Sequence, residues 1–421
     1  MTAPDRFQRF VERSHDDGRL VVQPRMGFPS IDAMRAGLLA VRDSAAGTVG
    51  TITVDSFTRV NDNDSARRAI ETGTPLNGFP VVAHGVTGTR AVLDGVAGPD
   101  FPVQVRHGSA LPYQLIEAAL AAGVDATEGG PVSYCLPYSR VPLRESTDDW
   151  ARSCDLIAAH SSPLHLETFG GCMLGQLCPP SVLVALSVLE AMFFAEHGIS
   201  SVSVSYAQQT HLGQDIAAVR ALRRLAAERL AGLHWHTVVY TFMGVYPRSE
   251  IGAFGLLEDS VRLAVAGGAQ RLVVKTPAEA HRIPTIAENV SALEFAAAVA
   301  AFAEPEEPAA DEPDPIYREA ARIIDATVTL APTVGAALVA AFAKGLLDIP
   351  YCLHRDNAGL ARAGIDATGR LCWTDPGRIP VEGRFAGRAG IGSAELLEML
   401  NHNRDNFDRI MLTGMRKEVS R

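Results

Sequence analysis

The stretch Glu128-Gly-Gly-Pro-Val-Ser-Tyr-Cys-Leu-Pro-Tyr138 is the most informative part of the sequence for the fold. Residues 131–134 predict a short buried strand that is entered through the flexible pair Gly129-Gly130. One carboxylate, that of Glu128, precedes the predicted strand, and the phenols of Tyr134 and Tyr138 follow it. Polar aromatic residues at the end of a strand suggest a functional site, because core packing alone does not require their hydroxyl groups.

Apolar runs of strand length recur along the chain, at residues 49–54, 79–83, 102–106, 131–134, 164–169, 201–205, 237–242 and 271–275. Most of these runs are apolar at successive positions, as is typical of strands buried on both faces of a parallel sheet. Helix-length segments separate them, and the clearest is residues 213–230, which carry an apolar stripe on one face. About eight strand–helix units in roughly 230 residues predict an α/β fold of the (β/α)8 (TIM) barrel type, whose usual size is about 250 residues.

A doubly wound open sheet is the alternative fold. Such sheets usually have a glycine-rich phosphate turn after the first strand. Here Asp55-Ser-Phe-Thr-Arg59 follows the run at 49–54, and neither a G-x-G-x-x-G motif nor a P-loop is present. The sequence therefore favours the barrel.

Three parts of the chain are expected to differ in structure. Residues 1–303 are predicted to form the barrel with an N-terminal segment, helical over residues 1 to about 20. Residues 304–315 form an acidic, proline-rich linker. Residues 316–421 are expected to be helical and irregular, with helices near 317–347 and 394–411, and to pack on the barrel without carrying its chemistry.

Composition excludes several classes of protein. The chain has 421 residues, 47% of them hydrophobic and 20% charged, and a formal net charge of −10. An acidic balance argues against nucleic acid or an anionic membrane as partner. No secretory signal or membrane span is visible, and six cysteines without metal-ligand spacing indicate reduced thiols and no metal site. We therefore expect a cytoplasmic protein.

Charged and aromatic residues stand at the predicted strand ends, where barrels hold their active sites. Three arginines, Arg25, Arg59 and Arg106, would repel one another in a dry site unless anions compensated them. Arginine binds carboxylates through two parallel hydrogen bonds, so these residues predict a small dicarboxylate ligand. Glu128 would complement an amine, and a dicarboxylic amino acid satisfies the whole set.

Each of these residues also has an ordinary structural interpretation. A single arginine at a strand end usually pairs with a structural carboxylate, and Lys275 could pair with Glu279 four residues later. Tyr134 and Tyr138 could be core residues with satisfied hydroxyls. Their concentration at one predicted face favours a site. No hydrolytic motif is present, which leaves a binding protein or an enzyme whose chemistry belongs to a cofactor.

The sequence resembles a known family over residues 20 to about 385. The motifs that carry the resemblance occur in order and are Gln23-Pro-Arg-Met-Gly27, Asp55-Ser-Phe-Thr-Arg59, Leu76-Asn-Gly-Phe-Pro80, Arg106-His-Gly108, Glu128 to Tyr138, Gln214-Asp-Ile-Ala-Ala218, Val273-Val-Lys-Thr-Pro-Ala-Glu-Ala280, Ile283-Pro-Thr285 and Arg355-Asp-Asn357. Together they resemble the large, catalytic (epsilon) subunit of glutamate mutase (methylaspartate mutase). That family uses adenosylcobalamin to rearrange a carbon skeleton through a radical.

The resemblance implies a role for each matching residue. L-Glutamate would be held by Arg25, Arg59 and Arg106, with Glu128 as the catalytic residue near the substrate amine. His107, Tyr134 and Tyr138 would complete the substrate site, and Phe169 is a weaker candidate for its wall. The adenosylcobalamin positions would be Gly27, Asn77, Pro137, Tyr246, Lys275, Glu279 and Ile283.

A partner is implied as well. The cobalamin-binding motif Asp-x-His-x-x-Gly is absent from this chain, and in the family it lies on a separate small subunit. The resemblance therefore implies such a subunit over the barrel mouth and a homodimer of this chain within a hetero-oligomer. The chain departs from the family in a shorter loop between Arg59 and Asn77, in Ala83-His84, and in a trimmed C-terminal region. Two alternatives stay open: the same chemistry on another dicarboxylic or related amino acid, and a non-catalytic dicarboxylate-binding homologue.

Overall fold

Eight parallel strands form the centre of the molecule. The computed structural model describes residues 5–173, 177–304, 315–382 and 391–409. The strand order is β1-β8-β7-β6-β5-β4-β3-β2, with every neighbouring pair parallel. The strands are β1 (Val21–Pro24), β2 (Gly50–Thr53), β3 (Val103–Arg106), β4 (Ala126–Gly129), β5 (His165–Thr168), β6 (Ser201–Ala207), β7 (His234–Tyr240) and β8 (Arg271–Val274).

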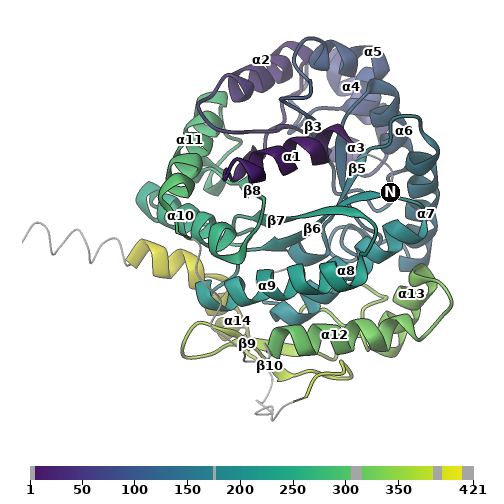
Figure 1. Ribbon diagram of the computed structural model, residues 1–421, viewed down its shortest axis with the longest axis vertical. Coiled ribbons are helices and arrows are strands. Elements are labelled where there is room, and N and C mark those ends of the chain that lie inside the picture. Colours follow the sequence, from purple (N-terminus) through teal and green to yellow (C-terminus); the bar gives the residue numbers. More distant parts are fainter. Residues whose placement is uncertain (1–4, 174–176, 305–314, 383–390, 410–421) are drawn as a thin grey trace, which may run out of the picture.

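The sheet closes on itself between β1 and β2. A single bridge joins Val22 to Thr48, and the Thr53 amide donates to the Met26 carbonyl over 2.8 Å. Helices surround the strands (Figure 1). The predicted (β/α)8 barrel is thus confirmed, and the open-sheet alternative is wrong.

Two predicted strands are wrong. Residues 81–83 begin helix α5 (Val81–Leu93), and Phe79 forms only an isolated bridge to Val54, the residue after β2. Residues 131–134 lie in a turn, and the strand of this region is β4, a few residues earlier. Pro131 has no amide hydrogen for a sheet ladder, and the Val132 and Ser133 amides bond a side chain instead. The strand that completes the eight is β1, which none of the predicted runs covers.

The outer layer consists of α2 (Ile31–Arg42), α3 (Ser56–Arg59), α4 (Asn63–Thr72), α5, α6 (Tyr113–Ala122), α7 (Leu143–Ala159), α8 (Pro180–Glu196), α9 (Leu212–Arg229), α10 (Glu250–Gly267) and α11 (Ile286–Phe302), with 3-10 turns η1 (Gly170–Cys172) and η2 (Pro277–Ala280). The helix predicted at 213–230 is confirmed as α9. Across the described residues, we find no helix long and apolar enough to span a bilayer.

An N-terminal helix, α1 (Arg6–Asp16), lies across the face formed by the N-terminal ends of the strands (Figure 1). Phe7 stacks on His165 with ring centroids 5.1 Å apart, and the Gln8 carbonyl oxygen lies 2.7 Å from His236 Nδ1. The helix predicted before residue 20 is therefore present and closes this end of the barrel.

Residues 315–382 and 391–409 pack against the barrel. Helix α12 (Pro315–Val328) contacts α8 and α9, and it is followed by α13 (Val334–Lys344), by the antiparallel hairpin β9 (Arg362–Ile365) with β10 (Leu371–Asp375), and by α14 (Ser393–Leu400). Residues 402–409 are helical, and the remainder of the helix predicted to 411 lies outside the described residues.

Three contacts tie this C-terminal region to the mouth of the barrel, which is the face at the C-terminal strand ends. The Asp356 carboxylate accepts from the first amide of α7, that of Leu143, over 2.7 Å. Asp408 accepts from the Ser249 amide ahead of α10 over 3.0 Å. The side chain of Gln214 exchanges two hydrogen bonds with the Leu371 backbone. The region therefore helps to fix the helix starts that surround the mouth.

Candidate active site at the C-terminal strand ends

A buried ion pair lies at the centre of the site. Arg106 ends β3 and Glu128 lies in the neighbouring strand β4, with the guanidinium Nε donating to the carboxylate over 2.8 Å. Burial would lower the pKa of Arg106, but the charge of Glu128 raises it well above its usual range. Burial would raise the pKa of Glu128, but Arg106 outweighs this effect and lowers it. Both side chains are therefore charged.

Two tyrosines also donate to Glu128. The hydroxyl of Tyr134 bonds one carboxylate oxygen, and that of Tyr240, at the end of β7, lies 2.6 Å from the other. The Tyr240 hydroxyl contacts Glu167 of β5 as well, and its ring lies 5.0 Å from the Arg106 guanidinium carbon. Tyr240 thus reaches from β7 to two carboxylates that stand side by side on the adjacent strands β4 and β5.

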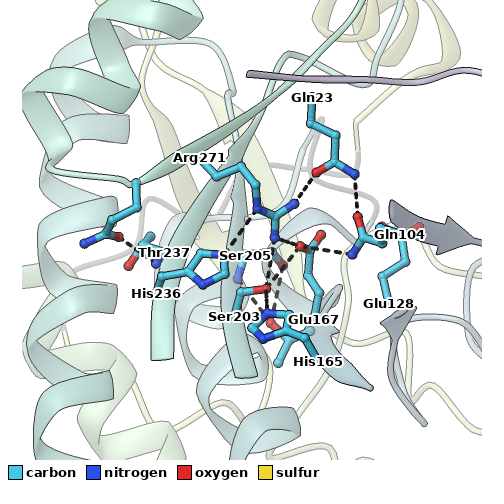
Figure 2. A network of polar contacts seen from close by, with 12 residues as sticks. Gln23, Gln104, Glu128, His165, Glu167, Ser203, Ser205, His236, Thr237 and Arg271 are labelled. Atoms are coloured by element: carbon cyan, nitrogen blue, oxygen red, sulfur yellow. Dashed lines mark hydrogen bonds and ion pairs between the residues drawn. The ribbon is translucent and has the colours of Figure 1, made fainter. Parts of the chain in front are cut away.

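Beneath this pair lies a second buried network (Figure 2). Arg271 of β8 donates to Glu167 and to Gln23, and its Nε lies 3.2 Å from His236. Neither Arg271 nor Glu167 has an exposed side chain. Since each charge is paired and further hydrogen-bonded, this network is tolerated in the barrel interior and fills it below the site.

Aromatic rings form one wall of the site. The Tyr134 ring lies 4.9 Å from Phe169, which follows β5, and 5.1 Å from His107. The Phe169 ring meets Tyr240 edge-on at 5.5 Å, and Trp150 of α7 stacks on His107 at 5.8 Å. These rings exclude water from around the ion pair.

His107 has a free donor in this wall. The Ser109 amide donates to its Nδ1 over 3.0 Å, so the proton of the neutral ring lies on Nε2. That nitrogen is buried and has no hydrogen-bond partner among the described residues. Burial lowers the pKa of His107 to about 4; Glu128 opposes this, whereas Arg59 adds to it. The ring is therefore neutral near pH 7 and can donate to a ligand.

Arg59 and Arg25 approach the same region. Arg59 Nε donates to the His107 carbonyl over 3.0 Å. Burial of the hydroxyl raises the pKa of Tyr138, and the nearby charges of Arg25 and Arg59 oppose that rise. Both arginines are thus near Tyr138, whose side chain is 45% exposed. The structure brings the three predicted arginines around one set of residues.

A second group surrounds the end of β8. Arg25 donates to Glu279 over 2.9 Å. The Lys275 ammonium lies 4.3 Å from the centre of the Tyr246 ring. Burial lowers the pKa of Lys275 to about 8, with Glu279 opposing and Arg25 reinforcing the shift. Arg25 is therefore paired with Glu279 of this second group and is also close enough to Tyr138 to oppose the rise of its pKa.

The other residues predicted for the cofactor lie at the rim. Gly27 follows β1, and a Cβ there would overlap the Thr53 carbonyl. Asn77 is exposed and accepts from the Ser56 amide over 2.9 Å. Pro137 is partly buried beside Tyr138, and Ile283 is 53% exposed. Asn77, Pro137 and Ile283 have no contact with the ion pair among the interactions of the described residues.

Several buried polar atoms near the mouth lack a hydrogen-bond partner among the described residues. All follow or end a strand on this face: Thr53 Oγ1, His107 Nε2, Ser109 Oγ, both side-chain atoms of Gln209 and Thr210 Oγ1. Buried polar atoms are rarely left unpaired without a reason such as a missing ligand. Their position supports the mouth as a binding face.

A cleft of about 1040 Å³ lies at the opposite end, lined by Arg6, Arg90, Asp125 and parts of α6 and α7. It lies at the N-terminal strand ends, and (β/α)8 barrels hold their active sites at the other end. We assign the site by its chemistry to the mouth.

Four buried residues in or next to the site were not predicted from the sequence: Trp150, Glu167, Glu190 and Tyr240. Glu167 and Glu190 were visible as single charges inside apolar segments. Tyr240 lay within the predicted strand at 237–242, but only closure of the barrel brings it to Glu128. Trp150 gave no signal.

These features define a (β/α)8-barrel protein with a charged, partly buried site at the C-terminal strand ends, where barrel enzymes hold their active sites. The family model for the methylaspartate mutase E chain (MutE) matches residues 1–388. The chain therefore belongs to the methylaspartate mutase E chain family, a family of mutase subunits.

Individual relatives agree with this family. The glutamate mutase epsilon subunit of Yersinia enterocolitica serotype O:8 / biotype 1B is 33% identical over 89% of this chain and 81% of that protein. That of Desulfitobacterium hafniense (strain Y51) is 32% identical over 86% of this chain and 78% of that protein. Among solved structures, tryptophan synthase subunit alpha from Legionella pneumophila str. Paris is similar with a TM-score of 0.40 and 13% identity, covering 71% of this chain and 99% of that chain.

Proposed function

We propose that this chain is the catalytic subunit of an adenosylcobalamin-dependent mutase that interconverts L-glutamate and (2S,3S)-3-methylaspartate. The observation that carries the proposal is the buried Arg106–Glu128 pair with Arg59 beside it. Opposite charges at one point fit a ligand that carries both carboxylates and an ammonium group. Family membership and the glutamate mutase relatives support the same reaction.

In this proposal the arginines bind the two substrate carboxylates. Arg106 and Arg59 would each offer a planar pair of donors, and a charge-assisted hydrogen bond is worth about 1.5–3 kcal/mol. Arg25 would reach the far carboxylate near Tyr138. The Nε2–H of His107 adds a neutral donor.

The substrate ammonium would bind Glu128. Its ionised carboxylate already accepts from Arg106, Tyr134 and Tyr240, so it is held in place before the ligand arrives. As the catalytic residue, Glu128 would keep the amine fixed during the rearrangement. Phe169 and the phenol rings would keep water from the reacting carbons.

The residues at the rim fit an adenosyl group. At Gly27 the backbone packs directly against the Thr53 carbonyl, and Thr53 Oγ1 is buried without a partner among the described residues, so it could bond a ligand there. When bound, adenosylcobalamin supplies the carbon-centred radical that removes hydrogen from the substrate. The residues that would hold it are Gly27, Asn77, Pro137, Tyr246, Lys275, Glu279 and Ile283.

A separate small subunit with the Asp-x-His-x-x-Gly motif would bring the cobalamin, because this chain lacks that motif. The relatives' designation as epsilon subunits is consistent with such a partner. In this proposal the partner docks over the mouth, and two copies of this chain form a cytoplasmic hetero-oligomer with it.

Reconstitution tests the proposal. The chain is combined with a cobalamin-binding small subunit, adenosylcobalamin and L-glutamate, and 3-methylaspartate is measured together with a substrate-dependent paramagnetic signal. Both are expected. A signal with another dicarboxylic amino acid alone would change the substrate, and tight L-glutamate binding without signal or product would favour a non-catalytic binding protein.

A further inference from the structure

We propose that Glu190 of α8 is a positioning residue for the substrate site, because its carboxylate holds the loop that carries Tyr134 against the loop that carries Phe169. The inference rests on the proposed function, since it concerns how the same site binds its amino acid. Glu190 does not belong to the residues assigned to substrate or cofactor above. Its side chain lies behind the aromatic wall and is fully buried.

Four hydrogen bonds converge on this carboxylate from two loops. Oε1 accepts from the amides of Val132 and Ser133 over 3.3 and 2.9 Å. Oε2 accepts from the Ser133 hydroxyl over 3.0 Å and from the Phe169 amide over 3.3 Å. The first three donors belong to the turn after β4 and the last to the segment after β5. One side chain therefore joins the two loops.

Both glycines of this turn are required by close packing, one of them against Glu190. A Cβ at Gly130 would overlap the Glu190 carboxylate, so only glycine leaves room for it. Gly129 has φ 136°, and a Cβ there would lie 2.5 Å from the Trp150 ring. The turn that replaces the predicted strand at 131–134 is thus shaped around a buried anion.

The substrate residues follow directly from this turn. Tyr134 is the next residue after Ser133, and its amide donates to the Gly130 carbonyl over 3.2 Å. Its hydroxyl bonds Glu128, and its ring packs on Phe169. If the turn loosens, the donor on Glu128 and the wall of the site move together.

Burial and the surrounding donors have opposite effects on the charge of Glu190. Burial raises its pKa to about 7, and the hydrogen bonds from Ser133, Phe169 and Val132 oppose that rise. All four neighbours are donors, so the ionised carboxylate satisfies them best.

Glu190→Gln tests the proposal with little change in volume. The amide has one acceptor oxygen, and its NH2 group would face two of the four donors. We expect deuterium exchange in peptides covering residues 129–139 and 169–173 to speed up at least 10-fold, and the Kd for L-glutamate to rise at least 10-fold. Ser187→Ala is the matched control, because it removes a buried hydrogen bond from the same helix, where the Ser187 hydroxyl accepts from the Ser205 amide over 3.0 Å. Its L-glutamate affinity should stay within about 2-fold of wild type.

Unchanged exchange in Glu190→Gln would overturn the proposal, and so would faster exchange with unchanged L-glutamate affinity. Should Glu190→Gln fail to fold, Ser133→Ala, which removes one of the four hydrogen bonds, must show the same two changes in weaker form. If the wild-type protein bound no L-glutamate, the proposed function would be contradicted instead. The exchange measurement alone would then decide whether Glu190 holds the two loops together.

Discussion

The Arg106 guanidinium and the Glu128 carboxylate lie 2.8 Å apart, and at least 94% of each side chain is buried, since 6% and 2% remain exposed. Without a ligand, each charge satisfies the other. A bound amino acid would divide the pair, its carboxylate taking Arg106 and its ammonium taking Glu128. The pair thus keeps both groups charged in a site that excludes water, at the cost of being opened by each ligand.

Replacing Arg106 by lysine should reduce kcat/KM for L-glutamate at least 100-fold. A lysine ammonium is a point charge and cannot reproduce the paired donors of guanidinium. Turnover in the reconstituted enzyme and calorimetric L-glutamate binding measure the loss. Arg19→Lys, at an exposed ion pair with Asp17, is the control. Near-normal efficiency in the Arg106 variant would remove this residue from the substrate site.

Tyr240→Phe keeps the ring but removes the hydroxyl that contacts Glu128 and Glu167. A buried acceptor that loses its donor costs about 1–3 kcal/mol. Urea denaturation should show a loss of this size. Tyr317→Phe, whose hydroxyl bonds the exposed Glu228, should change the free energy of unfolding by less than about 0.5 kcal/mol. Equal effects of the two substitutions would contradict the bridging role.

Gly27→Ala should destabilise the barrel. The added methyl group would collide with the Thr53 carbonyl, which is backbone and cannot rotate away. Overpacking of this kind costs about 1–3 kcal/mol. Gly47→Ala is the matched control, because nothing lies within 4 Å of a Cβ at that position. Equal denaturation midpoints for the two variants would show that the backbone between β1 and β2 moves apart to accept the methyl group.

Stability should rise with pH between about 8 and 10.5 through Lys275. Burial lowers its pKa from 10.5 to about 8, so in this interval the unfolded chain binds the proton more readily than the fold does. The gain is at most about 3 kcal/mol, because one pKa unit is worth about 1.4 kcal/mol. Urea titrations at pH 8 and 10 would show it in wild type and not in Lys275→Met.

The exposed Lys344 provides the comparison. In Lys344→Met the pH dependence should match that of wild type. If Lys275→Met followed the same curve as well, Lys275 would not be the group that titrates.

Asp408→Ala should weaken the attachment of the C-terminal region. Its carboxylate accepts from the amides of Arg248 and Ser249 at the start of α10, each over 3.0 Å. Loss of such a helix-start contact costs about 0.5–2 kcal/mol. Denaturation and limited proteolysis measure it, with Glu382→Ala, at an exposed ion pair with Arg322 in the same region, as control. Undiminished protease resistance would argue that other contacts hold the region.

The barrel could be predicted because its valine-rich strands are buried on both faces and recur with regular spacing. The strand β4 could not, since Ala126–Gly129 includes Thr127 and Glu128 and is less apolar than the turn that follows it. The apolar residues after Gly129-Gly130 are typical of a strand, but the Val132 amide donates to Glu190 and not to a neighbouring strand. A long-range side-chain contact therefore overrides the local pattern.

The candidate site was predictable only where neighbouring strands supply it. Arg106 and Glu128 lie on adjacent strands, so their meeting follows from the fold. Tyr240 reaches Glu128 across the barrel from β7, and no sequence pattern reports that contact. Glu167 lies beside Glu128 on the next strand, β5, but its place could not be predicted because β4 itself was not. The roles of the predicted residues, and the division of the chain at 304–315, stay predictions.

Helix α1 blocks the end of the barrel opposite the site, and the Arg271–Glu167 network fills the passage between them. Substrate and product would therefore enter and leave only through the mouth of the barrel, which is also where the proposed small subunit would dock. The residence time of that subunit would set the pace of exchange with the surrounding solution, and a tighter assembly would retain its product for longer.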